Sequence, residues 1–142
     1  MPQIEQIAPL VTRRLRQRVL YPNQSIAKVI LDEDDYGIHF GLYDHDRLIA
    51  VVSLFLDGIT ARFRKFAVDQ AYQGQGYGQQ LLDYIVTYAA QEGIQSLWCD
   101  ARITASAFYK KYGFNETGQA FMKNDIAYIR MEKQINTDNT KK

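Results

Sequence analysis

FAVDQAYQGQGYGQQLL, residues 66–82, contains the glycine run that decides the fold. The run itself, Gln73-Gly74-Gln75-Gly76-Tyr77-Gly78, follows a strand-like segment that ends at Val68 and precedes a helix-like segment. Glycines at alternate positions leave the backbone bare, so its N–H groups can approach a ligand closely. The positive dipole end of the following helix favours a phosphate or pyrophosphate. The run is therefore a candidate phosphate cradle, and a tight turn with glycines for geometry alone is the alternative.

The two common nucleotide-binding motifs do not match this run. A Walker loop ends in Gly-Lys-Ser/Thr, whereas Gly78 is followed by Gln79 and Gln80. A dinucleotide fingerprint needs a glycine three residues after its second one, and Gln79 stands there. Both common nucleotide-binding interpretations of the run are therefore weak.

A helix is predicted over residues 9–20. Apolar side chains recur at Val11, Leu15 and Val19, and Pro9 suits a first helical turn. The arginines of this segment are expected on its solvent-exposed face: Arg13, Arg14, Arg16 and Arg18. Residues 21–36, which end in an acidic run, are predicted to form a loop with at most a short helix.

The rest of the chain alternates between strands and helices, which predicts a mixed α/β fold. Residues 76–92 have paired apolar positions that repeat every four residues, typical of an amphipathic helix. A short helix is expected to be capped by Thr104 and to end at Gly113. Strands are expected at residues 4–7, 38–43, 48–56, 62–68, 94–99, 114–122 and 126–134.

The composition is that of one globular domain. The chain has 142 residues, of which 46% are hydrophobic and 23% are charged, a balance that argues against intrinsic disorder. Lys and Arg number 17, and Asp and Glu number 16, which excludes a strongly basic nucleic-acid-binding coat. We expect one domain over residues 1–135, followed by a flexible tail at residues 136–142.

Neither a metal centre nor a membrane span is expected. The single cysteine, Cys99, cannot form an intramolecular disulfide, and no Cys/His cluster has metal-ligand spacing. The longest apolar run, residues 48–56, is too short to cross a bilayer. The N-terminal residues lack the charged-then-apolar pattern of a secretory signal. These features predict a cytoplasmic protein in which Cys99 is buried and inert.

The glycine run and a second segment together resemble a known family. Val68 followed by Gln73-x-x-Gly76-x-Gly78 is similar to the coenzyme A motif of the GNAT N-acetyltransferase superfamily, Arg/Gln-x-x-Gly-x-Gly/Ala after a strand. Residues 105–114 resemble its Ala-x-x-x-Tyr-x-x-x-Gly-Phe segment. The two motifs stand in the family's order and separation, and the resemblance covers residues 38–133. Residues 97–102 look like a bacterial subgroup of small acetyltransferases of undefined acceptor.

The resemblance implies an architecture and a cosubstrate. The fold would be a splayed, mostly antiparallel mixed sheet with flanking helices, and the cosubstrate would be acetyl-CoA. Its pantetheine arm would enter between the Phe66–Val68 strand and the Trp98 strand. The residues that would bind it are Phe66, Ala67, Val68, Gln73, Gly74, Gln75, Gly76, Tyr77, Gly78, Gln79 and Arg102. Two positions depart from the family pattern, since Asp100 and Arg102 stand where relatives carry Asn.

The resemblance also places Tyr109 at the leaving thiolate, as hydrogen-bond donor or general acid. From the residues alone, the stronger expectation is that Tyr109 is a core aromatic beside Phe108 and Tyr112. The implied function is transfer of an acetyl group to a primary amine by direct attack in a ternary complex. A non-catalytic acyl-CoA-binding sensor is the alternative, because a sensor needs the glycines but not the tyrosine. A monomer and a homodimer are both compatible with the sequence, and the amine acceptor is not identified.

No residue is identified as the base that deprotonates the amine. The acidic run Asp32-Glu33-Asp34-Asp35 could attract a cationic acceptor, but a charge run is usually a solvated loop. His39 has a suitable intrinsic pKa, although a structural or surface role is the stronger expectation. Water can also relay the proton. The other candidates flank or lie within the closing strands: Glu116, Asp125 and Tyr128.

Overall fold

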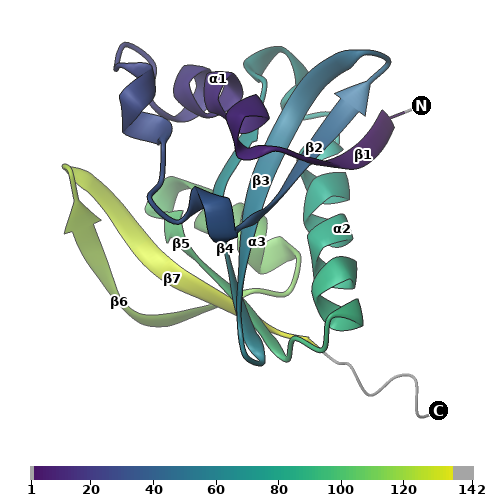
Figure 1. Cartoon of the computed structure of the whole chain (residues 1–142). Coiled ribbons are helices and arrows are strands. Elements are labelled where there is room, and N and C mark those ends of the chain that lie inside the picture. Colours follow the sequence, from purple (N-terminus) through teal and green to yellow (C-terminus); the bar gives the residue numbers. More distant parts are fainter. Residues whose placement is uncertain (1, 136–142) are drawn as a thin grey trace. The chain divides into compact units, whose positions relative to one another are not determined.

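Helix α1 begins at Pro9, whose missing N–H costs nothing in a first helical turn. The computed structural model describes residues 2–135 and shows β1 at Pro2–Ile7 and α1 at Pro9–Leu20 (Figure 1). Both predicted elements are confirmed. The predicted core face of α1 was partly wrong, because Val11 is 41% exposed whereas Arg16 is fully buried.

Strands β2 and β3 form an antiparallel ladder with β1. β2 spans Ile38–Asp44 and β3 spans Arg47–Asp57, with Gly41 opposite both Glu5 and Val51. β3 is buried without a break from Ile49 to Leu54, which fits the central strand predicted from its continuous apolar run.

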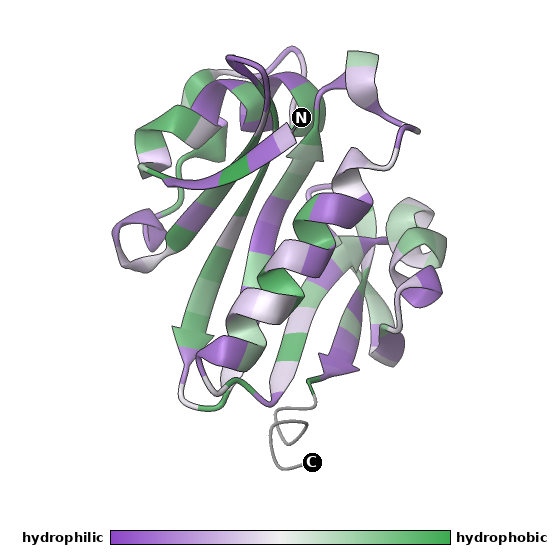
Figure 2. Ribbon diagram, turned by 90° about the vertical axis from the view of Figure 1, so that its right-hand side faces the viewer, coloured by the Kyte–Doolittle hydropathy of each residue, from purple (hydrophilic) through white to green (hydrophobic). Residues whose placement is uncertain are grey.

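Helices α1 and α2 cover opposite faces of this ladder. α2 spans Tyr77–Gln91, and its apolar and polar residues alternate along the ribbon (Figure 2). Tyr84 of α2 contacts Phe40, with ring centroids 5.3 Å apart. The adjacent His39 instead belongs to a hydrogen-bonded network with Arg16 of α1. Since successive strand residues point to opposite faces, the two helices lie on the two sides of β2.

The sheet is mixed and mostly antiparallel, as predicted. β4 spans Thr60–Val68 and β5 spans Ser96–Arg102, and the strand order is β1-β2-β3-β4-β5-β7-β6. β4 pairs with β5 in parallel over the register from Thr60 opposite Ser96 to Arg62 opposite Trp98. The remaining neighbours with a recorded register are antiparallel.

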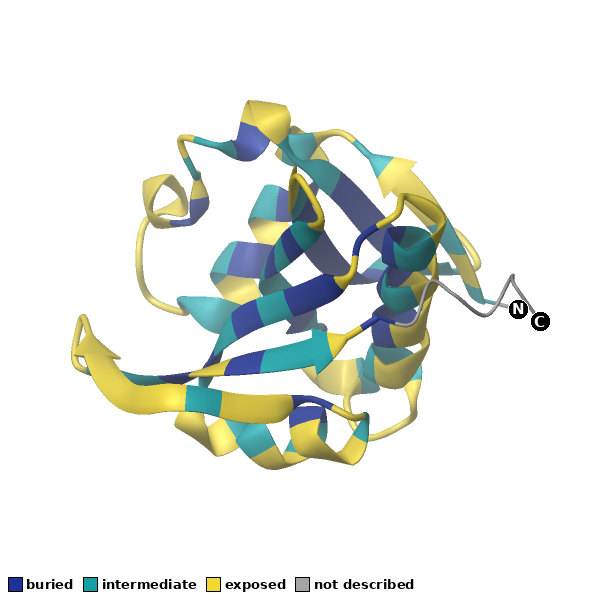
Figure 3. Cartoon of the chain, turned by 90° about the horizontal axis from the view of Figure 1, so that it is seen from below, coloured by how far each residue is buried: buried dark blue, intermediate teal, exposed yellow. Residues whose placement is uncertain are grey.

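The closing hairpin consists of β6, Asn115–Lys123, and β7, Ile126–Gln134. The pairing of β6 with β7 shifts register between Thr117 and Phe121, which is a bulge in β6. β6 is exposed over almost its whole length (Figure 3). The short helix α3, Ser106–Lys111, contacts both strands of the hairpin.

The chain divides into two compact units. The first comprises Phe63–Thr87 and the described residues up to Phe55, and the second comprises Leu56–Arg62 and the described residues from Tyr88 onward. The single domain expected from the sequence therefore stays a prediction. The splaying of the sheet between β4 and β5 also stays a prediction, because Phe63–Val68 and β5 belong to different units. The predicted tail at residues 136–142 lies outside the described residues. Within residues 2–135, no helix is long and apolar enough to cross a bilayer.

The predicted cap of the third helix was wrong. Thr104 lies within a 3-10 turn, Ile103–Ala105, that precedes α3. The residue at the N-cap of α3 is Ala105, and no side chain caps the helix there. The preceding 3-10 turn continues almost directly into α3, so the boundary expected at Thr104 does not form.

Candidate active site

The glycine run forms an exposed loop that leads into α2. Gly74 and Gly76 adopt φ angles of 78° and 90°, in the left-handed region that favours glycine. A side chain added at either position would meet no heavy atom within 4 Å, so the space beside the loop is open. The required backbone angles account for both glycines, and the open space leaves room for a ligand.

The first turn of α2 provides the polar face of this loop. The helix begins at Tyr77, and Gln80 donates its N–H to the carbonyl of Gly76. N–H groups of a first helical turn have no partner within the helix. No acidic residue lies in that turn, so nothing there opposes the positive dipole end. These features fit the pyrophosphate of coenzyme A.

Asp69, which the sequence analysis did not single out, anchors the loop to the end of β4. Its carboxylate accepts hydrogen bonds from the Ala71 N–H at 3.0 Å and from Arg18 at 2.8 Å, and Arg47 lies 3.6 Å away. Its own N–H donates to the Ile49 carbonyl at 2.7 Å. The Ala71 bond chiefly lowers the pKa of Asp69, and the two arginines lower it further against the effect of burial. Aspartate side chains often accept a hydrogen bond from the backbone N–H two residues further on, so an aspartate directly after a predicted strand is a sequence signal for such a turn.

The end of β4 has an irregular backbone. Lys65 has a φ angle of 56°, which is uncommon for a residue with a side chain. Its ammonium donates a hydrogen bond to the Tyr21 hydroxyl at 2.6 Å. The next residue is Phe66, whose backbone the resemblance assigns to the pantetheine arm and thioester.

The other predicted residues of this region lie close to the loop. Ala67 is buried, whereas Phe66 and Val68 are half-buried. The Gln73 side-chain amide donates to the Val68 carbonyl at 2.9 Å. This bond takes one of the two lone pairs that the carbonyl could offer to a pantetheine amide. The structure thus brings together, within the first unit, the predicted cofactor-binding residues from Phe66 to Gln79.

Tyr109 lies in the second unit and is buried in an aromatic cluster. Its ring centroid is 5.2 Å from that of Phe108 and 5.8 Å from that of Phe114. Burial raises the pKa of the Tyr109 hydroxyl far above its ordinary value, and neighbouring Cys99 adds to the effect. A tyrosine hydroxyl is neutral and can donate a hydrogen bond at pH 7 in any case, and burial only extends this range to higher pH.

Cys99 is buried on β5, as predicted. Burial raises the pKa of its thiol strongly, and the charge of Asp100 acts in the same direction. A thiol that stays protonated is a poor nucleophile, so the geometry does not favour an acetyl-cysteine route. Arg102 lies at the end of β5, half-buried, in the second unit, whereas the glycine run belongs to the first.

The acidic segment and the first helix were partly misjudged. Arg16, expected in solvent, is fully buried and forms an ion pair with Asp34, which is 3% exposed. His39 is buried as well, and both of its ring nitrogens are engaged, by Ser53 at 2.6 Å and by the Asp34 carbonyl at 2.8 Å. This structural role removes His39 from the candidate bases.

The remaining candidates for the base that deprotonates the amine lie in the second unit, and each has different neighbours. Glu116 pairs with Lys110 at 3.0 Å, and Asp125 is an exposed turn residue. Tyr128 stacks on Phe121, with centroids 5.7 Å apart.

Known proteins resemble this chain over almost its full length. Residues 6–135 match the family model "Acetyltransferase (GNAT) domain". An uncharacterized N-acetyltransferase of Bacillus subtilis, YitI, is 29% identical over 147 aligned positions that cover 96% of this chain and 99% of YitI.

Two solved structures show the same fold. The ribosomal-protein-S18-alanine N-acetyltransferase of Escherichia coli superposes with a TM-score of 0.80 at 23% identity, covering 95% of this chain and 94% of that one. A GNAT family acetyltransferase from Elizabethkingia anophelis, solved with acetyl-CoA bound, gives a TM-score of 0.72 at 18% identity and covers 94% and 97% of the two chains. The sequence match and the fold agree, and the chain belongs to the GNAT acetyltransferase family.

Proposed function

We propose that this protein is an acetyl-CoA-dependent N-acetyltransferase that acts on a primary amine by direct attack in a ternary complex. The observation that carries the proposal is the match of residues 105–114 to the family's tyrosine segment, with Tyr109 buried on α3. A protein that only binds the cosubstrate has no need of such a group. We further propose that the protein is cytoplasmic, as its sequence predicts.

The residues near the glycine run would hold the cosubstrate. The N–H groups of Gly74 to Gln79 would bind the pyrophosphate, and the backbone of Phe66 and Val68 would bind the pantetheine arm. Arg102 is proposed to contribute a further contact. Bound acetyl-CoA supplies an activated acetyl thioester, and the Phe66 N–H would donate to its carbonyl oxygen. A donor placed in this way is worth about 2.7–4 kcal/mol of transition-state stabilisation.

Tyr109 would stabilise the leaving sulfur. An ordinary tyrosine, with a pKa near 10, is a weaker acid than a thiol near 8.5, so full proton transfer is uphill by about 2 kcal/mol. Burial of Tyr109 makes this transfer still less favourable. The hydroxyl therefore acts mainly as a hydrogen-bond donor to the developing thiolate.

The acceptor must reach the site as a free amine. An alkyl amine with a pKa of about 10.4 is mostly protonated at pH 7, and deprotonation costs about 4 kcal/mol. With His39 occupied in the structural network, we assign the transfer of this proton to water. When the amide bond forms and the carbon–sulfur bond breaks, the attacking free amine loses a further proton, which water also accepts, and the sulfur leaves as a thiolate that Tyr109 stabilises.

Thiol release from acetyl-CoA tests this proposal. The protein would be incubated with a panel of polyamines, amino acids, aminoglycosides and peptides with free N-termini, and acetylated products would be identified by mass spectrometry. We expect amine-dependent thiol release with at least one class. Stabilisation by acetyl-CoA without transfer to any amine would instead favour the non-catalytic sensor.

A further inference from the structure

The face of β5 that carries Trp98 and Asp100 bears a cluster of charged and aromatic side chains. The Arg62 guanidinium lies 4.7 Å from the Trp98 ring centroid, and the Arg130 guanidinium lies 3.8 Å from it. Asp100 accepts one hydrogen bond from each arginine, at 3.0 Å from Arg62 and 3.3 Å from Arg130. Glu132 lies opposite Trp98 in the register of β7 and adds a second carboxylate, which accepts a hydrogen bond from the Ser96 hydroxyl at 2.6 Å.

The Arg130 guanidinium is held in place by two contacts, but not all of its hydrogen-bond donors are used. Its Nε atom bonds Asp100, and its guanidinium plane is stacked on Trp98. Within residues 2–135, its two terminal Nη groups have no hydrogen-bond partner. The side chain is about half exposed, at 49%. Because two contacts already fix the guanidinium, binding of a further group at the Nη atoms costs little side-chain entropy.

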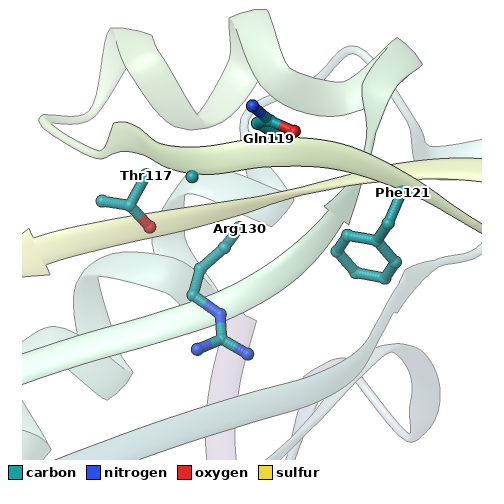
Figure 4. A pocket seen from close by; sticks show the side chains of 5 residues that line it. Thr117, Gln119, Phe121 and Arg130 are labelled. Carbon is teal, nitrogen blue, oxygen red and sulfur yellow. The ribbon is translucent and has the colours of Figure 1, made fainter.

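The free edge of Arg130 borders a pocket of about 310 Å³, which is lined by Thr117, Gly118, Gln119, Phe121 and Arg130. The pocket lies at the β6 bulge, where the register shifts between Thr117 and Phe121. Figure 4 shows Thr117 and Arg130 directed to the same side of the hairpin. Phe121 is 39% exposed and stacks on Tyr128, so it offers an aromatic surface beside the cation.

We propose that Arg130 binds the carboxylate of the acceptor, so that the preferred acceptor is a small amine that also carries a carboxylate and an aromatic or apolar group. This inference rests on the proposed function. The planar fork of a guanidinium matches the two oxygens of a carboxylate, and Phe121 covers an apolar substituent. The same fork can bind a phosphate of coenzyme A, and the experiments below distinguish the two ligands.

Arg130, which borders the pocket, lies on the face of the sheet opposite to Tyr109. Tyr109 neighbours Cys99, whereas Arg130 bonds Asp100, and successive strand residues point to opposite faces. Arg130 would therefore hold the acceptor without contacting the sulfur, and its loss should raise the KM for the acceptor more than it lowers kcat.

Trp98 provides a binding assay that does not depend on activity. It is the only tryptophan of the chain and lies against the Arg130 guanidinium. We expect benzoate to change tryptophan emission saturably in the wild type, and benzamide, which lacks the charge, to cause no such change. Arg130→Gln should abolish the response to benzoate. Equal responses to benzoate and benzamide, or a response that persists in Arg130→Gln, would overturn the site.

Paired amines test the acceptor assignment. Phenylalanine and phenylalaninamide differ in the carboxylate, and comparing their kcat/KM ratio between wild type and Arg130→Gln cancels the difference in amine reactivity. We expect the ratio to fall about 10-fold or more in the variant, as hydrogen bonds to charged groups allow, with an unchanged KM for acetyl-CoA. A rise in the KM for acetyl-CoA with an unchanged ratio would assign the site to a phosphate and overturn the inference.

Two further variants serve as controls. Lys123→Gln removes a positive charge from the end of β6, the strand that pairs with the strand of Arg130, outside the pocket lining, and should leave the ratio unchanged. Arg130→Lys keeps the charge but loses the fork, so it should lose most of the preference; full retention would refute bidentate binding.

The proposed function and this inference fail in different ways. Transfer to amines with no dependence on Arg130 would overturn the carboxylate site and leave the proposed function intact. A benzoate response that requires Arg130, without transfer to any amine, would support the anion site and overturn the acceptor assignment together with the proposed function.

Discussion

A buried ion pair ties the acidic segment of residues 32–35 to helix α1. The guanidinium of Arg16 donates to both Asp34 oxygens, at 2.9 and 3.0 Å, and to the Ser53 hydroxyl at 2.7 Å. Ser53 in turn bonds His39. The Asp34 carbonyl can only accept, so Nε2 of His39 carries a proton and donates to it; in the neutral ring, Nδ1 then accepts from the Ser53 hydroxyl. The network determines the tautomer of His39.

Asp34→Asn should destabilise the protein by about 3–5 kcal/mol at pH 7, because it leaves the Arg16 charge buried without its partner. Arg16→Met in the same chain should recover part of this loss. Urea unfolding measures both values. Asp35→Asn, an exposed neighbour in the same turn, is the matched control and should stay within about 0.5 kcal/mol of wild type.

The same pair predicts a dependence of stability on pH. Burial raises the pKa of Asp34, but the hydrogen bonds from Arg16 and the Leu31 N–H lower it by more, so the net shift is downward. Its contribution is therefore fully present above the unfolded pKa of about 4 and is lost as pH falls through the folded pKa. Asp34→Asn should show a smaller loss of stability between pH 5 and 2 than wild type. Equal slopes would contradict the role given to Asp34.

The burial of Arg16 could have been anticipated only in part. Thr12, Leu15 and Arg16 are the buried residues of α1, spaced three and four positions apart. That spacing defines a helix face, but an arginine on it is normally assigned to solvent because an unpaired buried charge is too costly. Its partner, Asp34, is 18 residues away, in a run of four acidic residues that gives no sign of which one is buried.

At the scale of elements, the importance of the unusual backbone angle in β4 can be tested by substitutions of Lys65. Both Lys65→Gly and Lys65→Val remove the bond to Tyr21, but only glycine tolerates the φ angle of 56°. Lys65→Val should be less stable than Lys65→Gly by about 1–2 kcal/mol and should turn over more slowly. Urea unfolding and thiol release measure the two effects. Equal turnover in both variants would show that the backbone conformation before Phe66 does not contribute to catalysis.

The loop before α2 is testable through cosubstrate binding. At 100 times its dissociation constant, acetyl-CoA should stabilise the wild type by about 2.7 kcal/mol, or raise its Tm by roughly 5–10 °C. Gly76→Val should abolish the shift, because its side chain would occupy the open space beside the loop and oppose the φ angle of 90°.

Gly58→Val is the matched control for this experiment. Gly58 has a φ angle of 62° and similarly open surroundings, in the turn between β3 and β4. This variant should lose comparable stability but keep the acetyl-CoA shift. A normal shift in Gly76→Val would refute the phosphate cradle.

Helices and strands were predictable where one pattern dominated. The alternation in β2, the continuous apolar run of β3 and the four-residue repeat in α2 all gave the correct element within a few residues. Two features gave no such pattern. The positive φ angle at Lys65 could not be read from the sequence, because lysine is an ordinary strand residue. The bulge after Thr117 contains Gly118, with a φ angle of 73°, and a glycine inside a strand is only a weak sign of a bulge.

At the scale of the whole molecule, the family was predictable because its two motifs are local. The glycine run and the segment around Tyr109 are each short, and each depends on backbone angles and residue types within a few positions. The acceptor side has no such motif. The pocket is lined by residues of β6 and β7, and Arg130 is held beside it by Asp100 and Trp98 of β5, about 30 residues earlier in the sequence, so the sequence alone could not indicate the arrangement.

The proposed reaction uses both compact units. The first contains the predicted cosubstrate loop, and the second contains Tyr109. Binding and turnover should therefore respond separately to substitution. Gly76→Val should lose both, whereas a change at Tyr109 should remove turnover alone.

The turnover of Tyr109→Phe tests the central claim most directly. The variant keeps the ring within its aromatic cluster and removes only the hydroxyl. We predict that kcat for thiol release falls at least about 100-fold, while the KM for acetyl-CoA and the thermal shift stay at wild-type values. Tyr112→Phe, the matched control three residues along the chain, should remain active. Near-normal turnover in Tyr109→Phe would contradict the assignment of the leaving-group donor, and equal losses of binding and turnover would show that Tyr109 is structural.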